Sequence, residues 1–386
     1  MFSDLSATIQ APIINYPITD SNLPFAEYIK QSRMIIEDRR EMLDAHSIAA
    51  EKIIEANSPF EYYPTNHNGK IKYGVLLIHG LLDCPFTYRE LGAHLQSQGI
   101  LSRAILLPGH GTRPGDLFSV SYHDWLQAVR YGIETLKREV DHVFLVGYST
   151  GAALSIYHAM QDDQIAGIVL LSPAIKVRTP VDVFASWFHF VNYFSKDRHW
   201  VYHLKEEDYV KYKSIAFNGV KQVTRLTESV REMRSEYPLN KPMYMIVSRE
   251  DETISSHDAI DFFMSQHHPE SKMLVYTSSD HVYSDNRIIT KKSTYPEINV
   301  AHISHPSLGF SANNPHYGQR GDYVHASHCD KNYIYGAYNR IEIVSFDLLA
   351  KLHLVKYPRR VLTYNPDFMN MAASISHFIK GEPDHR

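Results

Sequence analysis

The sequence predicts an α/β fold with a mostly parallel sheet, and two observations support this prediction. From Tyr73 onward, short apolar runs alternate with segments whose apolar residues recur every three or four positions. The apolar runs are nearly continuous, as expected for strands that are buried on both faces of a parallel sheet. With 386 residues, 44% of them hydrophobic, the chain is long enough for one large core with additions.

The predicted elements follow in a regular order along the chain. Strands are predicted at 73–80, 100–109, 142–149, 165–173, 241–248 and 272–278. Helices are predicted at 87–99, 121–140, 150–160 and 258–266. A last helix is predicted to begin at Asn365-Pro366, because asparagine is a good N-cap and proline suits the first helical position.

Three segments stand outside this alternation. Residues 1–65 are interpreted as an N-terminal extension with one or two charged helices, and residues 66–386 as the main domain. Residues about 175–235 and about 278–362 separate strands by more than a normal connection, and are interpreted as a cap insertion and a loop insertion. Long insertions at strand ends form lids and substrate walls in many α/β enzymes.

Composition and charge narrow the class of protein. The formal net charge of −4 provides no basic field, so a nucleic-acid partner is not expected. The chain contains no apolar run long enough for a membrane span, and its start lacks the regions of a signal peptide. The two cysteines, Cys84 and Cys329, cannot build a disulfide framework. We therefore expect a cytoplasmic protein, with export by a route that needs no signal peptide as the open alternative. The sequence also leaves the oligomeric state open.

A serine flanked by glycines lies where the strand at 142–149 meets the next helix. The stretch Gly147-Tyr148-Ser149-Thr150-Gly151 has the pattern G-x-S-x-G, which between a strand and a helix is typical of a nucleophile elbow. The turn is so tight that a Cβ atom two positions either side of the serine would collide with the backbone. A glycine-flanked turn can also be purely structural, so the prediction of a nucleophile at Ser149 needs support from elsewhere in the chain.

Two further turns provide that support. His79-Gly80 ends the strand at 73–80, and Pro108-Gly109-His110-Gly111 ends the next strand. The first turn is expected to direct the backbone N–H of Leu81 toward the serine. Together with the N–H of Thr150 it would form an oxyanion hole, in which each donor contributes about 3–4 kcal/mol. We expect the side chain of His79 to be satisfied by backbone groups.

The stretches "GVLLIHGLLDCPFTYREL", "LLPGHGTRPGDL" and "VGYSTGAALSIYHA", in this order and spacing, resemble the α/β-hydrolase superfamily, in particular its carboxylesterase and monoacylglycerol-lipase-like branch. The resemblance covers about residues 70–282 and the last helix. It implies an α/β-hydrolase fold: an eight-stranded, mostly parallel sheet with helices on both faces and a helical cap inserted after the sixth strand. It also implies a Ser–acid–His triad in that chain order, and no metal or organic cofactor.

The acid is expected directly after the strand at 241–248. Asp251-Glu252-Thr253-Ile254 resembles the family's Asp-x-x-Val or Ile pattern, which favours Asp251, with Glu250 as the fallback. A solvated acidic loop residue is the structural alternative for Asp251.

The base has two candidates. His281 follows the last clear strand and lies 30 residues after Asp251, a spacing usual for the family. Ser304-His305 ends a second strand-like run, and an apolar stretch and an Asn-Pro-x-Tyr-Gly turn follow it. This segment resembles a bacterial subgroup in which an inserted loop delays the catalytic histidine. His305 is our first assignment and His281 the alternative, with His302 as a third candidate.

Two histidine pairs invite a metal interpretation, His302-x-x-His305 and His325-x-x-His328-Cys329. Neither has the helical His-Glu-x-x-His or paired Cys-x-x-Cys context of a zinc site, so no metal is expected.

The expected function is therefore hydrolysis of a carboxylic ester through an acyl-enzyme, on a small-molecule or lipid-like substrate. Within the aromatic stretch 184–194 of the cap, Phe184, Trp187 and Phe188 are candidates for the wall of the acyl pocket. The same rings would also serve simply to pack a cap helix onto the domain. Alternatives are an acyltransferase or thioesterase with the same triad, or a binding protein of this fold without turnover.

Overall fold

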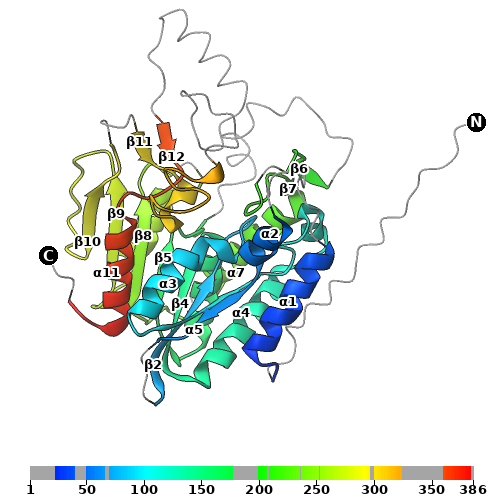
Figure 1. Ribbon diagram of the computed structural model, residues 1–386. Helices are drawn as coiled ribbons and strands as arrows, with labels where there is room; N and C mark the ends of the chain where they lie inside the picture. The colour runs from blue at the N-terminus through cyan, green and yellow to red at the C-terminus, as the bar shows by residue number, and fades with distance from the viewer. Residues whose placement is uncertain are drawn as a thin grey trace, which may run out of the picture.

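The computed structural model describes residues 22–39, 49–65, 69–176, 199–206, 208–234, 236–251, 253–295, 300–323 and 360–383. Its centre is an eight-stranded sheet in the order β1-β3-β2-β4-β5-β8-β9-β10 (Figure 1). Only β1 runs antiparallel to its neighbour, so the predicted mostly parallel sheet is confirmed. The strands of this sheet are β1 (Phe60–Tyr62), β2 (Ile71–Ile78), β3 (Leu101–Ile105), β4 (Val140–Tyr148), β5 (Ile165–Leu171), β8 (Met243–Ser248), β9 (Lys272–Thr277) and β10 (Ile288–Lys292).

Helices cover both faces of this sheet, as predicted. The first face carries α4 (Tyr122–Lys137), α5 (Thr150–Gln161), α7 (Phe217–Met233) and α8 (Ser256–Met264). The second face carries α3 (Arg89–Ser97) and α11 (Phe368–Lys380). Burial of each large apolar side chain in these two cores contributes about 1.5–3 kcal/mol. The apolar stripe predicted for α4 is buried as expected, at Trp125, Val129, Ile133 and Leu136.

Several predicted helix boundaries differ from the structure, and hydrogen bonds explain the differences at α4 and α11. Helix α4 begins after Ser121, which shares a capping box with Asp124, but it ends before Val140, because Val140 pairs with β2 as the first residue of β4. Helix α11 begins at Phe368 rather than at Asn365-Pro366. The backbone N–H of Asn365 donates to the Phe310 carbonyl over 2.8 Å, which holds that residue outside the helix.

The N-terminal extension packs on the main domain. It contributes α1 (Phe25–Arg39) and α2 (Ala50–Asn57). The hydroxyl of Tyr28 donates to the carbonyl of Leu106 over 3.2 Å and accepts from its N–H over 3.0 Å. Arg39 forms an ion pair of 2.9 Å with Asp116. Helix α1 is thus attached to the loop after β3 by both apolar and polar contacts.

The cap insertion begins after β5, the fifth strand of the sheet in chain order, whereas the resemblance implied the sixth. Its described part contains a small antiparallel pair, β6 (Trp200–Tyr202) and β7 (Ile215–Ala216), and then α7. The aromatic stretch 184–194 lies outside the described residues, and so do Phe184, Trp187 and Phe188.

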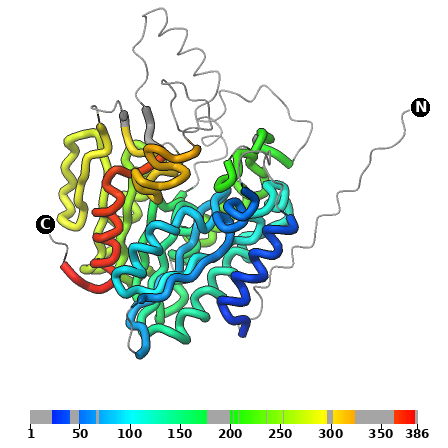
Figure 2. Tube along the Cα trace, in the orientation of Figure 1, coloured from blue at the N-terminus to red at the C-terminus, as the bar shows by residue number. Residues whose placement is uncertain are grey.

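The loop insertion contains three strands, of which only the one at 300–303 was predicted, as the strand-like run that ends at Ser304-His305. They are β10, which extends the main sheet, and the parallel pair β11 (Val300–Ile303) and β12 (Arg360–Leu362). Figure 2 shows the segment 300–323 and the segment 199–216 lying above the same end of the sheet, where the parallel strands have their carboxyl ends. This is the end at which ligands bind in open α/β sheets.

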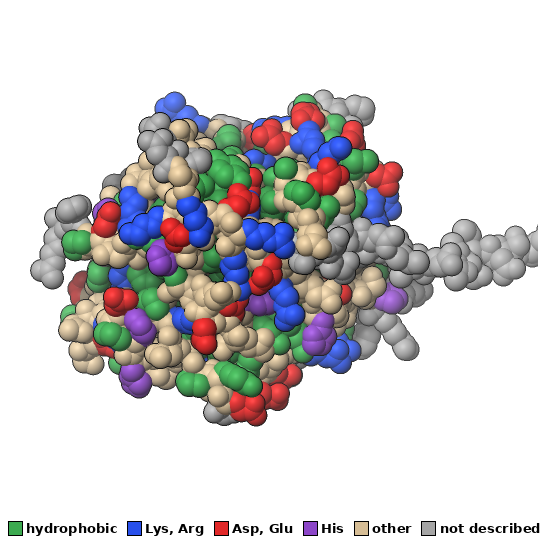
Figure 3. Space-filling view, turned by 90° about the horizontal axis from the view of Figure 1, so that it is seen from below, with side chains coloured by type: hydrophobic (Ala, Val, Ile, Leu, Met, Phe, Trp, Pro, Cys, Tyr) green, Lys and Arg blue, Asp and Glu red, His purple; other side chains and the backbone are tan. Residues whose placement is uncertain are grey.

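The opposite end of the molecule has a mixed surface. Figure 3 views the molecule from below and shows basic and acidic side chains interspersed over this face. Ion pairs near the amino ends of the strands include Lys70 with Asp141 at 2.7 Å and Lys137 with Asp162 at 2.6 Å. None of the helices within the described residues combines the length and the apolar character that crossing a membrane requires.

Candidate active site

Ser149 stands in a strained backbone conformation between β4 and α5. Its φ is +51° and its ψ −110°, a region that costs a residue with a Cβ about 1–3 kcal/mol. The surrounding backbone holds it there, because the Ser149 N–H donates to the Leu171 carbonyl over 2.9 Å and its own carbonyl accepts from Ala174 N–H over 3.2 Å. The half-buried side chain therefore projects out of the strand direction at the carboxyl end of the sheet.

The flanking glycines are required by close backbone approach. A Cβ at Gly147 would lie 2.3 Å from the carbonyl oxygen of Gly151, and a Cβ at Gly151 would lie 2.0 Å from the carbonyl oxygen of Ile78. Neither distance is possible for a real Cβ atom. The G-x-S-x-G pattern thus has a local steric cause in this chain.

Asp251 and His305 form a buried pair. Nδ1 of His305 lies 2.7 Å from Oδ2 of Asp251, and the Asp251 side chain is 0% exposed. The other carboxylate oxygen accepts backbone N–H groups from Thr253 at 2.8 Å and Ile254 at 2.9 Å. Because Nδ1–H donates to a carboxylate, the neutral ring carries its lone pair on Nε2. A group so oriented can accept a proton.

Tyr148 connects this pair to the elbow. Its hydroxyl donates to the backbone carbonyl of His305, and the two rings lie with their centroids 5.4 Å apart. Tyr148 directly precedes Ser149, so His305 packs against the elbow, although β4 and His305 are far apart in the sequence. Sequence reasoning missed this tyrosine, since the second position of the elbow pattern accepts many residue types.

The other candidates for acid and base lie elsewhere. His281 is exposed, and its ring packs edge-on against Tyr283 at 4.6 Å. The carboxylate of Glu250 accepts from the backbone N–H of Ser278 at 2.9 Å and the hydroxyl of Ser293 at 3.0 Å. His302 lies in β11, where burial lowers the pKa of its ring despite the nearby charges of Glu250 and Asp251. The structure thus brings Asp251 together with His305.

The two candidate oxyanion donors border Ser149. Thr150 is the first residue of α5, where backbone N–H groups lack an intrahelical acceptor. Leu81 follows Gly80, whose position is so close to the elbow that a Cβ there would lie 3.2 Å from the Cβ of Ser149. Leu82 has a φ of +65°, a second strained residue at this turn.

His79 supports this turn through its ring, as expected. Nδ1–H donates to the Gly80 carbonyl over 2.8 Å, and Nε2 accepts from Leu107 N–H over 3.0 Å. Burial lowers the pKa of His79 to about 4, so the ring stays neutral at physiological pH. It is a structural histidine.

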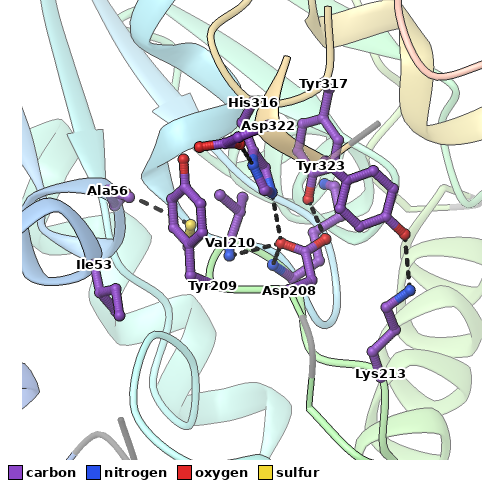
Figure 4. A network of polar contacts seen from close by, with 12 residues as sticks. Ile53, Ala56, Asp208, Tyr209, Val210, Lys213, His316, Tyr317, Asp322 and Tyr323 are labelled. Carbon is purple, nitrogen blue, oxygen red and sulfur yellow. Dashed lines mark hydrogen bonds and ion pairs between the residues drawn. The ribbon is translucent and has the colours of Figure 1, made fainter. Parts of the chain in front are cut away.

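A partly buried ionic cluster nearby was not predicted: His316 and Asp208 are 3% exposed, and Asp322 is 39% exposed. His316 lies between the carboxylates of Asp208 and Asp322, with Tyr317 donating to Asp208 over 2.5 Å (Figure 4). The only sequence signal was the turn Asn314-Pro315-His316-Tyr317-Gly318, which gave no indication of its partners.

Metal binding finds no support in the described part of the chain, where no group of three or more His, Cys, Asp or Glu side chains could hold an ion. His325, His328 and Cys329 lie outside the described residues. Cys84 is buried, and its thiol donates to the carbonyl of Ala56 over 3.6 Å.

Comparison with known proteins points to one family. The sequence model of the family described as serine aminopeptidase, S33, matches residues 69–283, more than half of the chain. The thermostable monoacylglycerol lipase of Bacillus sp. (strain H-257) is 34% identical over 110 residues, which cover 28% of this chain and only 43% of that lipase. A monoglyceride lipase homolog of monkeypox virus is 24% identical over 242 residues, which cover 58% of this chain and 87% of the viral protein.

Solved structures also resemble the chain. The monoacylglycerol lipase of Paleococcus ferrophilus has a TM-score of 0.44 at 19% identity, with 57% of this chain and 88% of that chain covered. Est1E of Butyrivibrio proteoclasticus with bound ferulic acid has a TM-score of 0.44 at 18% identity, with 60% and 90% covered.

Proposed function

The chain belongs to the serine aminopeptidase S33 family, with the α/β-hydrolase fold, and from this membership we propose that it is a serine hydrolase that cleaves carboxylic esters. The observation that carries the proposal is the 2.7 Å contact between His305 and Asp251, packed against the residue that precedes Ser149. A buried carboxylate that orients a histidine beside a strained serine is the arrangement that activates a hydroxyl nucleophile.

The proposed reaction uses three side chains in two steps. Ser149 Oγ attacks the ester carbonyl carbon while Nε2 of His305 accepts the hydroxyl proton, and Asp251 stabilises the imidazolium. The imidazolium then gives this proton to the alkoxy oxygen as the carbon–oxygen bond breaks, which releases the alcohol and leaves an acyl group on Ser149. Water attacks the acyl group by the same route, and release of the acid restores the serine.

The two amides are proposed to act on the charge that develops during each attack. The N–H groups of Leu81 and Thr150 would donate to the carbonyl oxygen as it becomes negative. Thr150 opens a helix of 12 residues, whose dipole adds to this stabilisation.

The proposed substrate class is an ester with an apolar acyl group, such as a monoacylglycerol. The names of the Bacillus and monkeypox virus relatives support this class. Phe184, Trp187 and Phe188 remain our candidates for the acyl wall.

The assignment is tested by a pair of histidine variants. His305→Ala is expected to lower kcat for p-nitrophenyl esters by about 10³-fold or more, because Ser149 then lacks its base. His281→Ala is the matched control and is expected to stay within about twofold of the wild type. The reverse result would assign the base to His281.

A serine variant tests the nucleophile. Ser149→Ala is expected to abolish both ester turnover and covalent labelling by a fluorophosphonate probe, with an unchanged circular dichroism spectrum. Full activity in this variant would refute the proposal. Product analysis with added alcohol or thiol separates hydrolysis from acyl transfer and thioester cleavage. A wild-type protein that shows neither labelling nor turnover would point to a binding protein instead.

A further inference from the structure

A short segment of the cap, residues 208–213, lies against the turn that would hold the oxyanion. We call this segment the cap strip and residues 80–83 the Leu81 turn. The backbone N–H of Tyr212 donates to the carbonyl of Leu82 over 2.9 Å. This hydrogen bond fixes the Leu82–Asp83 peptide unit, two units after the one that carries the Leu81 N–H, at a residue whose φ of +65° is strained.

A side chain of the cap strip holds the same turn from a second direction. Nζ of Lys211 lies 2.6 Å from Oδ1 of Asp83, whose side chain is 3% exposed. Asp83 also accepts from the N–H of Cys84 at 2.8 Å and from the hydroxyl of Thr87 at 2.7 Å. The Lys211 ammonium also lies over the ring of Phe310, with Nζ 5.3 Å from the ring centroid. A buried carboxylate with these partners fixes the end of the Leu81 turn.

The cap strip is itself held by the partly buried cluster of Figure 4. One oxygen of Asp208 accepts from the N–H groups of Val210 at 2.8 Å and Lys211 at 3.3 Å, which shapes the strip as an Asx-type turn. The same carboxylate meets Nε2 of His316 at 3.0 Å. Asn57 of α2 adds a hydrogen bond of 2.8 Å to the carbonyl of Tyr209.

The charge state of His316 follows from its two neighbours. Nδ1 faces the carboxylate of Asp322 and Nε2 faces that of Asp208, so both ring nitrogens donate. Burial alone would lower the pKa of His316, but the hydrogen bonds and charges of Asp208 and Asp322 outweigh it and raise that pKa. Lys52 pairs with Asp322 at 2.5 Å and balances the second carboxylate. The cluster is a compact, neutral ionic unit.

The cluster joins parts of the chain that are far apart. Lys52 belongs to α2 of the N-terminal extension, Asp208 to the cap, and His316 and Asp322 to the segment that begins with His305. Glu90, which follows the Leu81 turn at the start of α3, accepts from Ser311 N–H at 3.0 Å and from Asn314 at 2.7 Å. The candidate base and the candidate oxyanion donor are thus supported by the same set of contacts.

We infer that Lys211 and the Asp208–His316–Asp322 cluster are positioning residues, which hold the Leu81 turn against the cap strip and thereby set the backbone N–H that receives the oxyanion. This inference rests on the proposed function. None of these side chains is proposed to touch the substrate. Their contribution is expected in the transition state, where a misplaced donor loses most of its value.

The test compares two lysines of the cap. Lys211→Met keeps the apolar stem and removes the contact with Asp83. Lys221→Met is the matched control, because Lys221 is an exposed residue of α7 outside the cap strip. Lys211→Met is expected to lower kcat for p-nitrophenyl butyrate about tenfold with KM within about twofold, and Lys221→Met to change neither.

A transition-state analogue separates positioning from general stability. A trifluoromethyl ketone forms a tetrahedral adduct whose oxyanion needs the same donors, so its affinity for Lys211→Met is expected to fall by the same factor as kcat. His316→Gln, which cannot donate to both carboxylates, is expected to give a similar loss. In the double variant the two losses are expected not to add, since both act through one strip. Asp322→Asn replaces His316→Gln if the latter does not fold.

The outcomes are distinct from those that test the proposed function. If the wild type neither turns over esters nor reacts with a fluorophosphonate, the proposed function fails before any variant is compared. The inference alone is overturned if the wild type is active and Lys211→Met has the same kcat, calculated per fluorophosphonate-labelled site, and the same affinity for the trifluoromethyl ketone. Additive losses in the double variant would also overturn it.

Discussion

The conformation of Ser149 is maintained by its neighbours at the level of single atoms. Its hydrogen bonds to Leu171 and Ala174 fix the backbone on both sides. Gly151 lets α5 start directly beneath the end of β2, where the carbonyl of Ile78 leaves no room for a side chain. A change at Gly151 therefore displaces the strand end that carries the Leu81 turn as well as the elbow.

This close approach yields a prediction for Gly151→Ala. Its Cβ would meet backbone oxygens at 2.0 Å and 2.7 Å, at Ile78 and His79, and backbone cannot yield cheaply. We expect a loss of about 3 kcal/mol in the free energy of unfolding, measured by urea denaturation, and a loss of ester turnover beyond it. Gly115→Ala is the control, because the nearest atom to its Cβ is a carbon of Phe118 at 3.5 Å. Equal stability of the two variants would contradict this steric account.

The order of the central elements is readable from local sequence. The strands β2 to β5, β8 and β9 are apolar runs, and the helices between them have apolar stripes, so each element follows from a pattern within its own residues. Strand β10, with the sequence Ile-Ile-Thr-Lys-Lys, is largely exposed and has no such pattern. The pairing of β11 with β12 joins residues about sixty positions apart, and no local signal specifies it.

The site shows the same division. The elbow at Ser149 is a contiguous motif and was predicted from it. The choice between His281 and His305 depended on where two strand ends lie in space, which spacing alone does not determine. The cluster around His316 was missed, because its members come from three distant segments and their types are common in loops. The roles of these residues in catalysis remain predictions.

Helix α1 shows how an extension becomes part of the domain. Tyr28, 1% exposed, satisfies both backbone groups of Leu106 with one hydroxyl. Tyr28→Phe removes the hydroxyl that bonds the N–H and the carbonyl of Leu106. We therefore expect a loss of about 2 kcal/mol in the free energy of unfolding. The measurement is the midpoint of urea denaturation. Tyr237→Phe, at a tyrosine that is 50% exposed, is the control and is expected to be neutral. No loss in Tyr28→Phe would mean that α1 does not stay docked in solution.

For the molecule as a whole, buried histidines set how stability depends on pH. Burial lowers the pKa of His79 to about 4, of His110 to about 3 and of His158 to about 4. Below about pH 6.5 these histidines bind protons in the unfolded chain but stay neutral in the folded protein. The free energy of unfolding therefore falls as the pH falls. His316 acts in the opposite sense, because its raised pKa gives stability that is lost as the pH rises through that pKa. Asp208, with its pKa lowered to about 2, loses its contribution only between about pH 4 and pH 2.

The expected loss of stability at acidic pH can be tested at His158. Wild-type stability in urea is expected to be lower at pH 5 than at pH 7. In His158→Gln this difference is expected to be smaller by about 2 kcal/mol, because one histidine with a lowered pKa in the folded state has been removed. The change in the difference is the readout, so any destabilisation by the substitution itself cancels. His281→Gln, at an exposed histidine, serves as the control. An unchanged pH difference in His158→Gln would contradict the assignment.

The two margins of the main sheet have a consequence for how copies of the chain meet. β1 is only three residues long, and β10 ends in Lys291 and Lys292. An edge strand can form backbone hydrogen bonds with a strand of another molecule. A short edge strand and positively charged side chains both oppose such pairing. These two features therefore oppose intermolecular sheet extension. Replacing both lysines with valine is expected to increase fibril formation at high protein concentration.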